Sequence, residues 1–165
     1  LYTALQSGVP FVVRYPRGKG EGAAWRDEAF ERLPIGRGRR LTEGDDMAVL
    51  TIGPVGNVAA RAVKRAAAEG VSAAHYDLRF ARPLDEELLD EVGRRFERVV
   101  TVEDGVVRGG VGSAVRDFLD RRGYRTQVRS LGIPDDRFVE HGTPAELYAQ
   151  CGFDEEGILR AILER

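Results

Sequence analysis

The chain has 165 residues, of which 42% are hydrophobic and 32% charged; this excludes a disordered polypeptide and suffices for one domain with its own core. Its formal net charge of −2 gives no electrostatic basis for binding nucleic acid or a membrane surface, and we expect neither partner. A single cysteine, Cys151, excludes an internal disulfide and, with only two histidines, argues against a typical zinc site.

The first residues predict the end of a helix, Leu1–Leu5, which Gly8 closes. Because the chain starts inside an element and without methionine, we expect it to be part of a longer polypeptide. No apolar run approaches the ~20 residues that span a bilayer, and no signal peptide is visible. Low cysteine usage suits a reducing compartment, so we expect a cytoplasmic location.

A short strand is predicted at Phe11–Val13, ending at Pro16, because β-branched and aromatic residues favour strands and proline cannot donate to a ladder. Arg14 and Arg17 then lie at the end of the strand, where side chains can reach a ligand. Guanidinium groups suit planar anions, and phosphate above all. From residue chemistry alone, two surface arginines without a ligand are the simpler interpretation.

Residues 21–36 are polar, contain glycine and proline and show no sustained period, which predicts a linker. Trp25 and Phe30 are its bulky side chains, and we expect them to hold it against a surface. Residues 37–41 follow as a short edge strand, since charged side chains suit an edge.

From Met47 onward, strands and helices alternate. Strands are predicted at Met47–Ile52, Val71–Leu78, Val99–Val102 and Gln127–Leu131. Helices are predicted at Val58–Glu69 with Asn57 as N-cap, at Asp85–Arg95, from Gly112 or Ser113 to Arg122, at Pro144–Gln150 and at Asp154–Glu164. This rhythm, with strands that lack polar alternation, indicates a doubly wound α/β fold whose parallel sheet carries helices on both faces.

The glycine-rich stretch Glu103–Ser113 is predicted as a loop between a strand and a helix, where α/β folds bind ligands. It has neither the dinucleotide fingerprint nor the lysine of a phosphate-binding loop. Exposed amides at the helix start could hold an anion. The favoured alternative is that glycines such as Gly109 and Gly112 let the loop pack closely against a neighbouring domain or subunit.

Glu103 and Asp104 are adjacent acids at the end of a strand, which invites an acid/base or metal-binding role. Adjacent strand residues point in different directions, however, so a capping or interface role is favoured. We expect structural roles for His141, for His75 within a strand, and for Cys151 as a small buried hydrophobe.

Helix signals are clear at two further places. Thr143 is the expected N-cap of its helix, with Pro144 first and Glu146 completing a capping box. Residues 79–85, which hold two arginines around a phenylalanine, are interpreted as a strand-to-helix connection that ends at Asp85 in the first helical turn.

Five motifs cover nearly the whole chain in order: RYPRG (14–18), LPIGRG (33–38), DLRFARPLDEELL (77–89), VTVEDGVVRGGVGSAV (100–115) and LGIPDDRFVEHGTPAELYAQCGFDEEGI (131–158). Together they resemble the C-terminal region of the 1-deoxy-D-xylulose-5-phosphate synthases, a family of transketolase-like enzymes that depend on thiamine diphosphate. The departures are small: Glu103-Asp104-Gly105 stands where the family often has Glu-Glu-Asn, and Val111 where an aromatic is common.

The resemblance implies a three-layer α/β/α sandwich whose five-stranded sheet is mostly parallel, with one antiparallel edge strand at Gly38–Leu41. It also implies a domain plan. Residues 1–20 would be the tail of the preceding pyrimidine-binding domain, residues 21–36 a linker, and residues 37–165 the transketolase-like C-terminal domain.

The resemblance further implies a function. The family condenses pyruvate with glyceraldehyde 3-phosphate, with loss of carbon dioxide, to feed isoprenoid, thiamine and pyridoxal synthesis. Thiamine diphosphate and Mg²⁺ are held by the first domain and the activating glutamate lies in the second, so this chain would carry no catalytic residue, bind no cofactor and be inactive alone. Arg17 would contact the phosphate of the aldehyde substrate, with Arg14 as a secondary candidate.

Implied partners are the thiamine-binding domains of the same polypeptide and a second copy in a homodimer, where this region would support the dimer and the substrate entrance. Two other functions stay open. The chain could be the C-terminal domain of another thiamine-diphosphate enzyme, such as a 2-oxoacid dehydrogenase β subunit, or a non-catalytic module for subunit interaction or regulation.

Overall fold

The computed structural model describes residues 1–16 and 29–164. Its helices are α1 (Tyr2–Leu5), α2 (Val55–Ala68), α3 (Glu86–Arg95), α4 (Val111–Arg121), α5 (Pro144–Cys151) and α6 (Glu155–Leu163). Its strands are β1 (Arg39–Thr42), β2 (Met47–Ile52), β3 (Ala73–Asp77), β4 (Arg98–Val106) and β5 (Gln127–Ile133). No helix of the described residues is long and apolar enough to cross a membrane.

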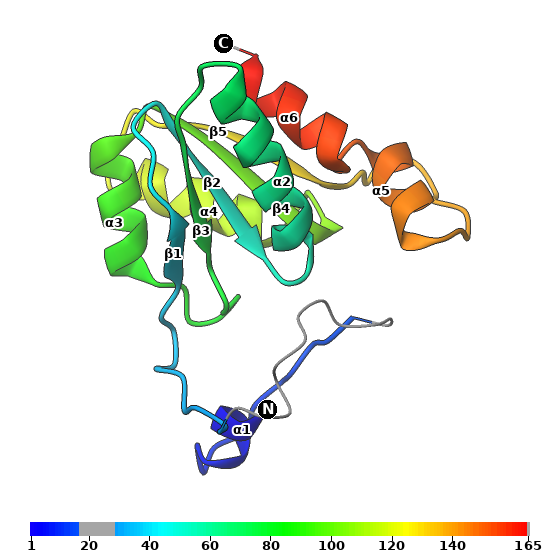
Figure 1. The fold of residues 1–165 in the computed structure, drawn as a ribbon. Coiled ribbons are helices and arrows are strands. Elements are labelled where there is room, and N and C mark those ends of the chain that lie inside the picture. Colours follow the sequence, from blue (N-terminus) through cyan, green and yellow to red (C-terminus); the bar gives the residue numbers. More distant parts are fainter. Residues whose placement is uncertain (17–28, 165) are drawn as a thin grey trace.

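The strands form one sheet in the order β1-β3-β2-β4-β5. β1 runs antiparallel to β3, and the other pairs are parallel. Helices α2 and α6 cover one face of the sheet and α3 and α4 the other (Figure 1). The predicted three-layer sandwich with a mostly parallel five-stranded sheet and one antiparallel edge strand is therefore confirmed.

The apolar run of β2 serves two cores at once. Met47 and Val49 belong to the core under α2 and α6, whereas Ala48 and Leu50 belong to the core under α3 and α4, and all four are fully buried. Successive strand residues point to opposite faces, so a strand covered on both sides needs apolar residues at every position. This is why β2 shows no alternation of polar and apolar residues.

Helix α2 starts earlier than predicted. Its N-cap is Pro54, without a side-chain hydrogen bond, and Asn57 lies inside the helix, so the predicted cap was wrong. The chain reverses at Gly53, whose φ of 78° suits glycine, and the proline ring of Pro54 already fixes the φ that a helix requires. A side-chain cap at Asn57 is therefore not needed.

Strand β4 runs four residues beyond the predicted end at Val102, to Val106, so Glu103-Asp104-Gly105 is part of a strand and not of a loop as predicted. The parallel ladder with β5 shifts register between Val102 and Val106 and then resumes at Ile133. The irregularity admits glycine and acidic residues into the strand without ending it, because a bulge leaves residues out of regular pairing.

The predicted strand at Phe11–Val13 is wrong, because residues 9–16 form no regular element. A strand needs a neighbour to pair with its backbone groups, and none of the described residues supplies one; Val12 is 94% exposed. The predicted helix near Leu1–Leu5 is present as α1. Of the bulky linker residues, Phe30 stacks on Tyr2 with ring centroids 5.8 Å apart, and Trp25 lies outside the described residues.

Candidate functional site

The carboxyl ends of β2, β3 and β4 meet at one edge of the sheet, where parallel α/β folds hold ligands. The N-terminal segment, residues 9–16, comes to this edge. Arg14 donates from Nη2 to the main-chain oxygen of Asp104 at 2.8 Å. Phe11 meets Phe80, just after β3, edge to face with ring centroids 6.3 Å apart. These contacts join a segment to strands that lie far from it in the sequence.

Of the two arginines predicted to bind phosphate, only Arg14 is among the residues that the structure describes. Arg14 lies at the carboxyl edge with one nitrogen bonded to Asp104. Its guanidinium carries five N–H groups and the side chain is exposed, so further donors face solvent. Arg17 lies outside the described residues, and its role stays a prediction.

Tyr148 of α5 is a member of this site that the sequence did not reveal. Its hydroxyl donates to Oδ2 of Asp104 at 3.2 Å, and its ring lies 4.6 Å from that of Phe153. Burial, and then the Asp104 carboxylate, raise the pKa of Tyr148 to about 12, although the charge of Arg14 acts in the opposite direction. The phenol therefore stays a hydrogen-bond donor at neutral pH. A tyrosine on a helix 44 positions away carries no local sequence signal for this contact.

Glu103 holds the start of α4. Its two carboxylate oxygens accept from the backbone N–H groups of Val111 at 2.9 Å and Gly112 at 2.8 Å, and it is 7% exposed. The predicted capping role is confirmed. Because Glu103 already occupies these amides, they are not available to an external anion.

The glycines of this stretch serve contacts within the domain. A Cβ atom on Gly110 would lie 2.5 Å from the Glu103 carboxylate, and one on Gly112 would lie 2.4 Å from Thr101 Oγ1. Both distances are shorter than real carbon contacts, so glycine is required where α4 meets the sheet. Packing of the loop, at Gly109 for example, against another domain or subunit stays a prediction.

His75 is fully buried within β3, which confirms the expected structural role and places it in the core. Thr51 Oγ1 donates to the Tyr76 carbonyl at 3.1 Å, so its lone pair must accept from His75 Nε2 at 3.0 Å. Nδ1 is then an unprotonated acceptor, and it has no hydrogen-bond partner among the described residues. Burial lowers the pKa of His75 to about 4, so the ring is neutral near pH 7.

The predicted capping box of α5 is confirmed by the paired hydrogen bonds of Thr143 and Glu146. His141, just before it, is exposed, so the structural role expected for it is not seen. Cys151 is only half-buried, contrary to the prediction of a buried residue, because it lies at the rim of the core beneath α6.

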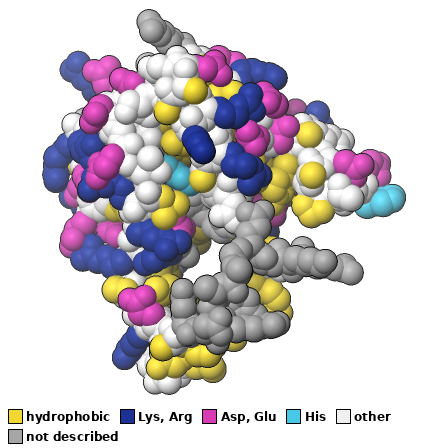
Figure 2. Space-filling view, viewed as in Figure 1, with side chains coloured by type: hydrophobic (Ala, Val, Ile, Leu, Met, Phe, Trp, Pro, Cys, Tyr) yellow, Lys and Arg dark blue, Asp and Glu magenta, His cyan; other side chains and the backbone are white. Residues whose placement is uncertain are grey.

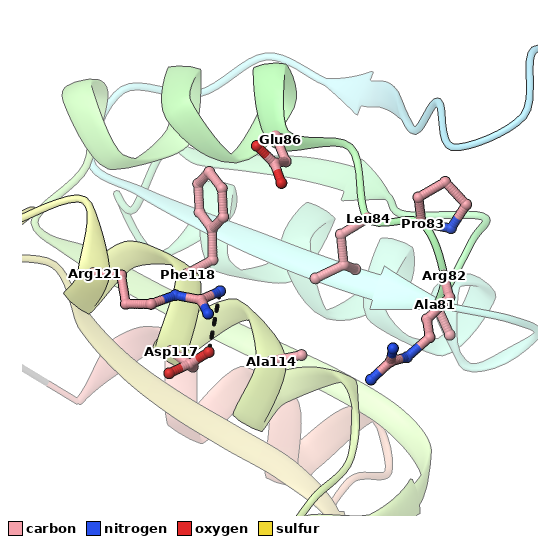
Figure 3. A pocket seen from close by; sticks show the side chains of 9 residues that line it. All are labelled: Ala81, Arg82, Pro83, Leu84, Glu86, Ala114, Asp117, Phe118 and Arg121. Atoms are coloured by element: carbon pink, nitrogen blue, oxygen red, sulfur yellow. Dashed lines mark ion pairs between the residues drawn. The ribbon is translucent and has the colours of Figure 1, made fainter.

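An open groove of about 550 Å³ lies between residues 81–86 and α4. Its lining includes Arg82, Arg121, Asp117 and Glu86 above an apolar floor (Figure 3). Arg121 and Asp117 form an ion pair at 3.2 Å, and Glu86 pairs with the neighbouring Arg122 at 3.0 Å. Both signs of charge line the groove, so its electrostatics select no particular ligand.

The family resemblance implies that Mg²⁺ is held by a domain outside this chain, and the described residues offer no metal site of their own. They contain no group of three or more His, Cys, Asp or Glu side chains that could hold a metal ion. The buried acid of the carboxyl edge, Glu103, is already bonded to two backbone amides. Within the described residues, the site is thus an arginine held at the edge of a sheet, with further N–H donors that suit an anion.

Residues 36–158 match the family model of the transketolase C-terminal domain. The chain is 52% identical over 164 residues to the 1-deoxy-D-xylulose-5-phosphate synthase of Bacteroides fragilis, covering 98% of the chain and 25% of that protein. It is 46% identical over 162 residues to the synthase of Alkalilimnicola ehrlichii, with 98% and 25% covered. The chain thus spans about a quarter of the length of these relatives.

Among solved structures, one described as a split-gene transketolase in an inactive β4 tetramer is similar, with a TM-score of 0.74 and 34% sequence identity. The likeness covers 82% of this chain and 45% of that one.

Proposed function

Because this chain belongs to the transketolase C-terminal domain family, we propose that it forms the C-terminal part of a 1-deoxy-D-xylulose-5-phosphate synthase. The observation that carries the proposal is the match to synthases over 98% of the chain at 52% identity, which extends beyond the domain model at both ends. The similarity to the synthases therefore includes the N-terminal segment with RYPRG, which lies outside the residues that the domain model matches.

The complete polypeptide would condense pyruvate with glyceraldehyde 3-phosphate with loss of carbon dioxide, in the cytoplasm, as a step toward isoprenoids, thiamine and pyridoxal. Thiamine diphosphate and Mg²⁺ would be bound by domains that this chain, which spans about a quarter of its relatives' length, does not include. This chain alone would be inactive. Its part in the reaction would be at the entrance for the aldehyde substrate. Arg17 would bind the phosphate of that substrate, with Arg14 as the secondary candidate.

The domain plan belongs to the same proposal: residues 1–20 as the tail of a preceding pyrimidine-binding domain, 21–36 as a linker and 37–165 as the C-terminal domain. Its support is the exposed apolar surface of the first residues, where Leu1, Leu5 and Val12 are 80%, 75% and 94% exposed. Figure 2 shows hydrophobic side chains gathered around α1. Such a surface suits burial against the rest of that domain, and a homodimer would complete the assembly.

The first test is the mass and activity of the native polypeptide that carries this sequence. We expect it to be several-fold longer than 165 residues and to form 1-deoxyxylulose 5-phosphate from pyruvate and glyceraldehyde 3-phosphate with thiamine diphosphate and Mg²⁺. Arg17→Ala in that polypeptide should raise the KM for the aldehyde and have less effect on the KM for pyruvate, because a lost phosphate contact is mainly lost binding.

Three results would contradict the proposal: carboligation by the isolated chain, a native polypeptide of only this length, or acyl transfer to a lipoyl carrier. The second would indicate an independent interaction or regulatory module. The third would indicate a 2-oxoacid dehydrogenase β subunit.

A further inference from the structure

Three parts of the chain meet at Asp104. The residue belongs to β4 and lies in the irregular stretch between Val102 and Val106. Its main-chain oxygen accepts from Arg14 of the N-terminal segment, and its carboxylate accepts from Tyr148 of α5. One strand residue therefore links the arginine of the candidate site to helix α5.

The Tyr148 side of this link is held firmly. Its ring packs against Phe153, which is 1% exposed and belongs to the core beneath α6. The helix that carries it starts at a complete capping box. Since the phenol stays protonated at neutral pH, it donates to the carboxylate continuously and fixes the orientation of Asp104.

The Arg14 side is lightly held by comparison. In the segment that carries it, Val12 is 94% and Tyr15 82% exposed, so little burial fixes the position of the backbone there. Among the described residues, a hydrogen bond to Asp104 and a ring pair between Phe11 and Phe80 join this segment to the sheet edge. The orientation of Arg14 thus depends on where Asp104 lies.

We propose that Asp104 and Tyr148 are positioning residues for the aldehyde site: they hold Arg14 by one nitrogen, so that its remaining N–H groups face the substrate phosphate. Helix α5 would then belong to the substrate site although it touches no substrate. This inference rests on the proposed function, because it concerns the same aldehyde and the same arginine.

The test uses Tyr148→Phe in the complete polypeptide. Loss of one hydrogen bond is expected to raise the KM for glyceraldehyde 3-phosphate about three- to tenfold, with kcat and the KM for pyruvate unchanged. In an Arg14→Gln background the same substitution should have no further effect, since the arginine that it positions is gone. Amide hydrogen exchange in residues 9–16 should be faster in Tyr148→Phe than in the unmodified enzyme.

Tyr124→Phe is the matched control. Its hydroxyl donates to Asp90 at 3.0 Å, the same chemistry in a half-buried tyrosine, but between other elements. It should change neither the aldehyde KM nor exchange in residues 9–16.

An unchanged aldehyde KM or unchanged exchange in Tyr148→Phe, or an effect that adds fully to that of Arg14→Gln, would overturn the positioning role. Because the unmodified polypeptide would still carry out the condensation, the proposed function would stand. Absence of condensation by the unmodified polypeptide would instead overturn the proposed function, and the positioning role with it.

Discussion

At the scale of single residues, the pair Thr51 and His75 shows how one hydrogen bond determines the state of another group. Thr51 has one hydroxyl proton and gives it to the Tyr76 carbonyl, so His75 must donate from Nε2. The ring cannot take a second proton without placing a charge in the core. Stability should therefore depend on pH through this residue.

We predict that the free energy of unfolding falls as the pH is lowered from about 6.5 to about 4. The folded state keeps His75 neutral down to about pH 4, whereas the unfolded chain takes up a proton near 6.5. The unfolded state therefore binds more protons in this interval, and the loss is about 3 kcal/mol in total. Urea unfolding at a series of pH values measures it.

His75→Leu should flatten this dependence, because an apolar side chain in the core takes up no proton. His141→Gln, at the exposed histidine, is the control and should leave the slope as it is. An equally steep slope in His75→Leu would show that carboxylates alone cause the dependence.

At the scale of elements, helix α4 begins without a side-chain cap of its own, since its N-cap is Gly110. A helix start leaves several N–H groups unbonded. Here a strand residue supplies the missing acceptors, as both oxygens of Glu103 bond the amides of Val111 and Gly112. The negative charge also lies favourably at the positive end of the helix dipole.

Glu103→Gln should lower the free energy of unfolding by about 2 kcal/mol, because the glutamine amide offers one acceptor and turns its NH₂ toward a buried backbone donor. The urea midpoint should fall with an unchanged m-value. Glu140→Gln, at an exposed glutamate, should have no effect. Equal midpoints for the two variants would contradict the assignment of the cap.

At the scale of the whole molecule, the sheet with its two covered faces is separate from the first 16 residues, which contact it through Arg14 and Phe11. The C-terminal end is, by contrast, part of a core: Phe153, Ile158 and Ile162 are at most 1% exposed. The two ends should therefore contribute very differently to stability.

Removal of residues 1–35 should change the free energy of unfolding by less than about 1 kcal/mol, since the described part of this segment joins the domain through the hydrogen bond of Arg14 and the ring pair of Phe11 and Phe80. Removal of residues 153–165 takes three large buried side chains out of one core, at roughly 5 kcal/mol or more, and should abolish cooperative unfolding. Chemical denaturation of both truncated chains against the intact one measures the difference. A large loss on removing residues 1–35 would contradict residues 37–165 as the folding unit.

The sequence by itself determined the alternation of strands and helices, the covered sheet and the capping box at Thr143, because these depend on local propensity and on burial of every strand position. It also indicated, through RYPRG and four other motifs, the family of the chain. It did not determine that Phe11–Val13 stays unpaired, that β4 continues through Glu103, or that Tyr148 meets Asp104 beside Arg14. Strand pairing and contacts across 44 and 90 positions depend on which segments the fold brings together, so only the tertiary structure decided them.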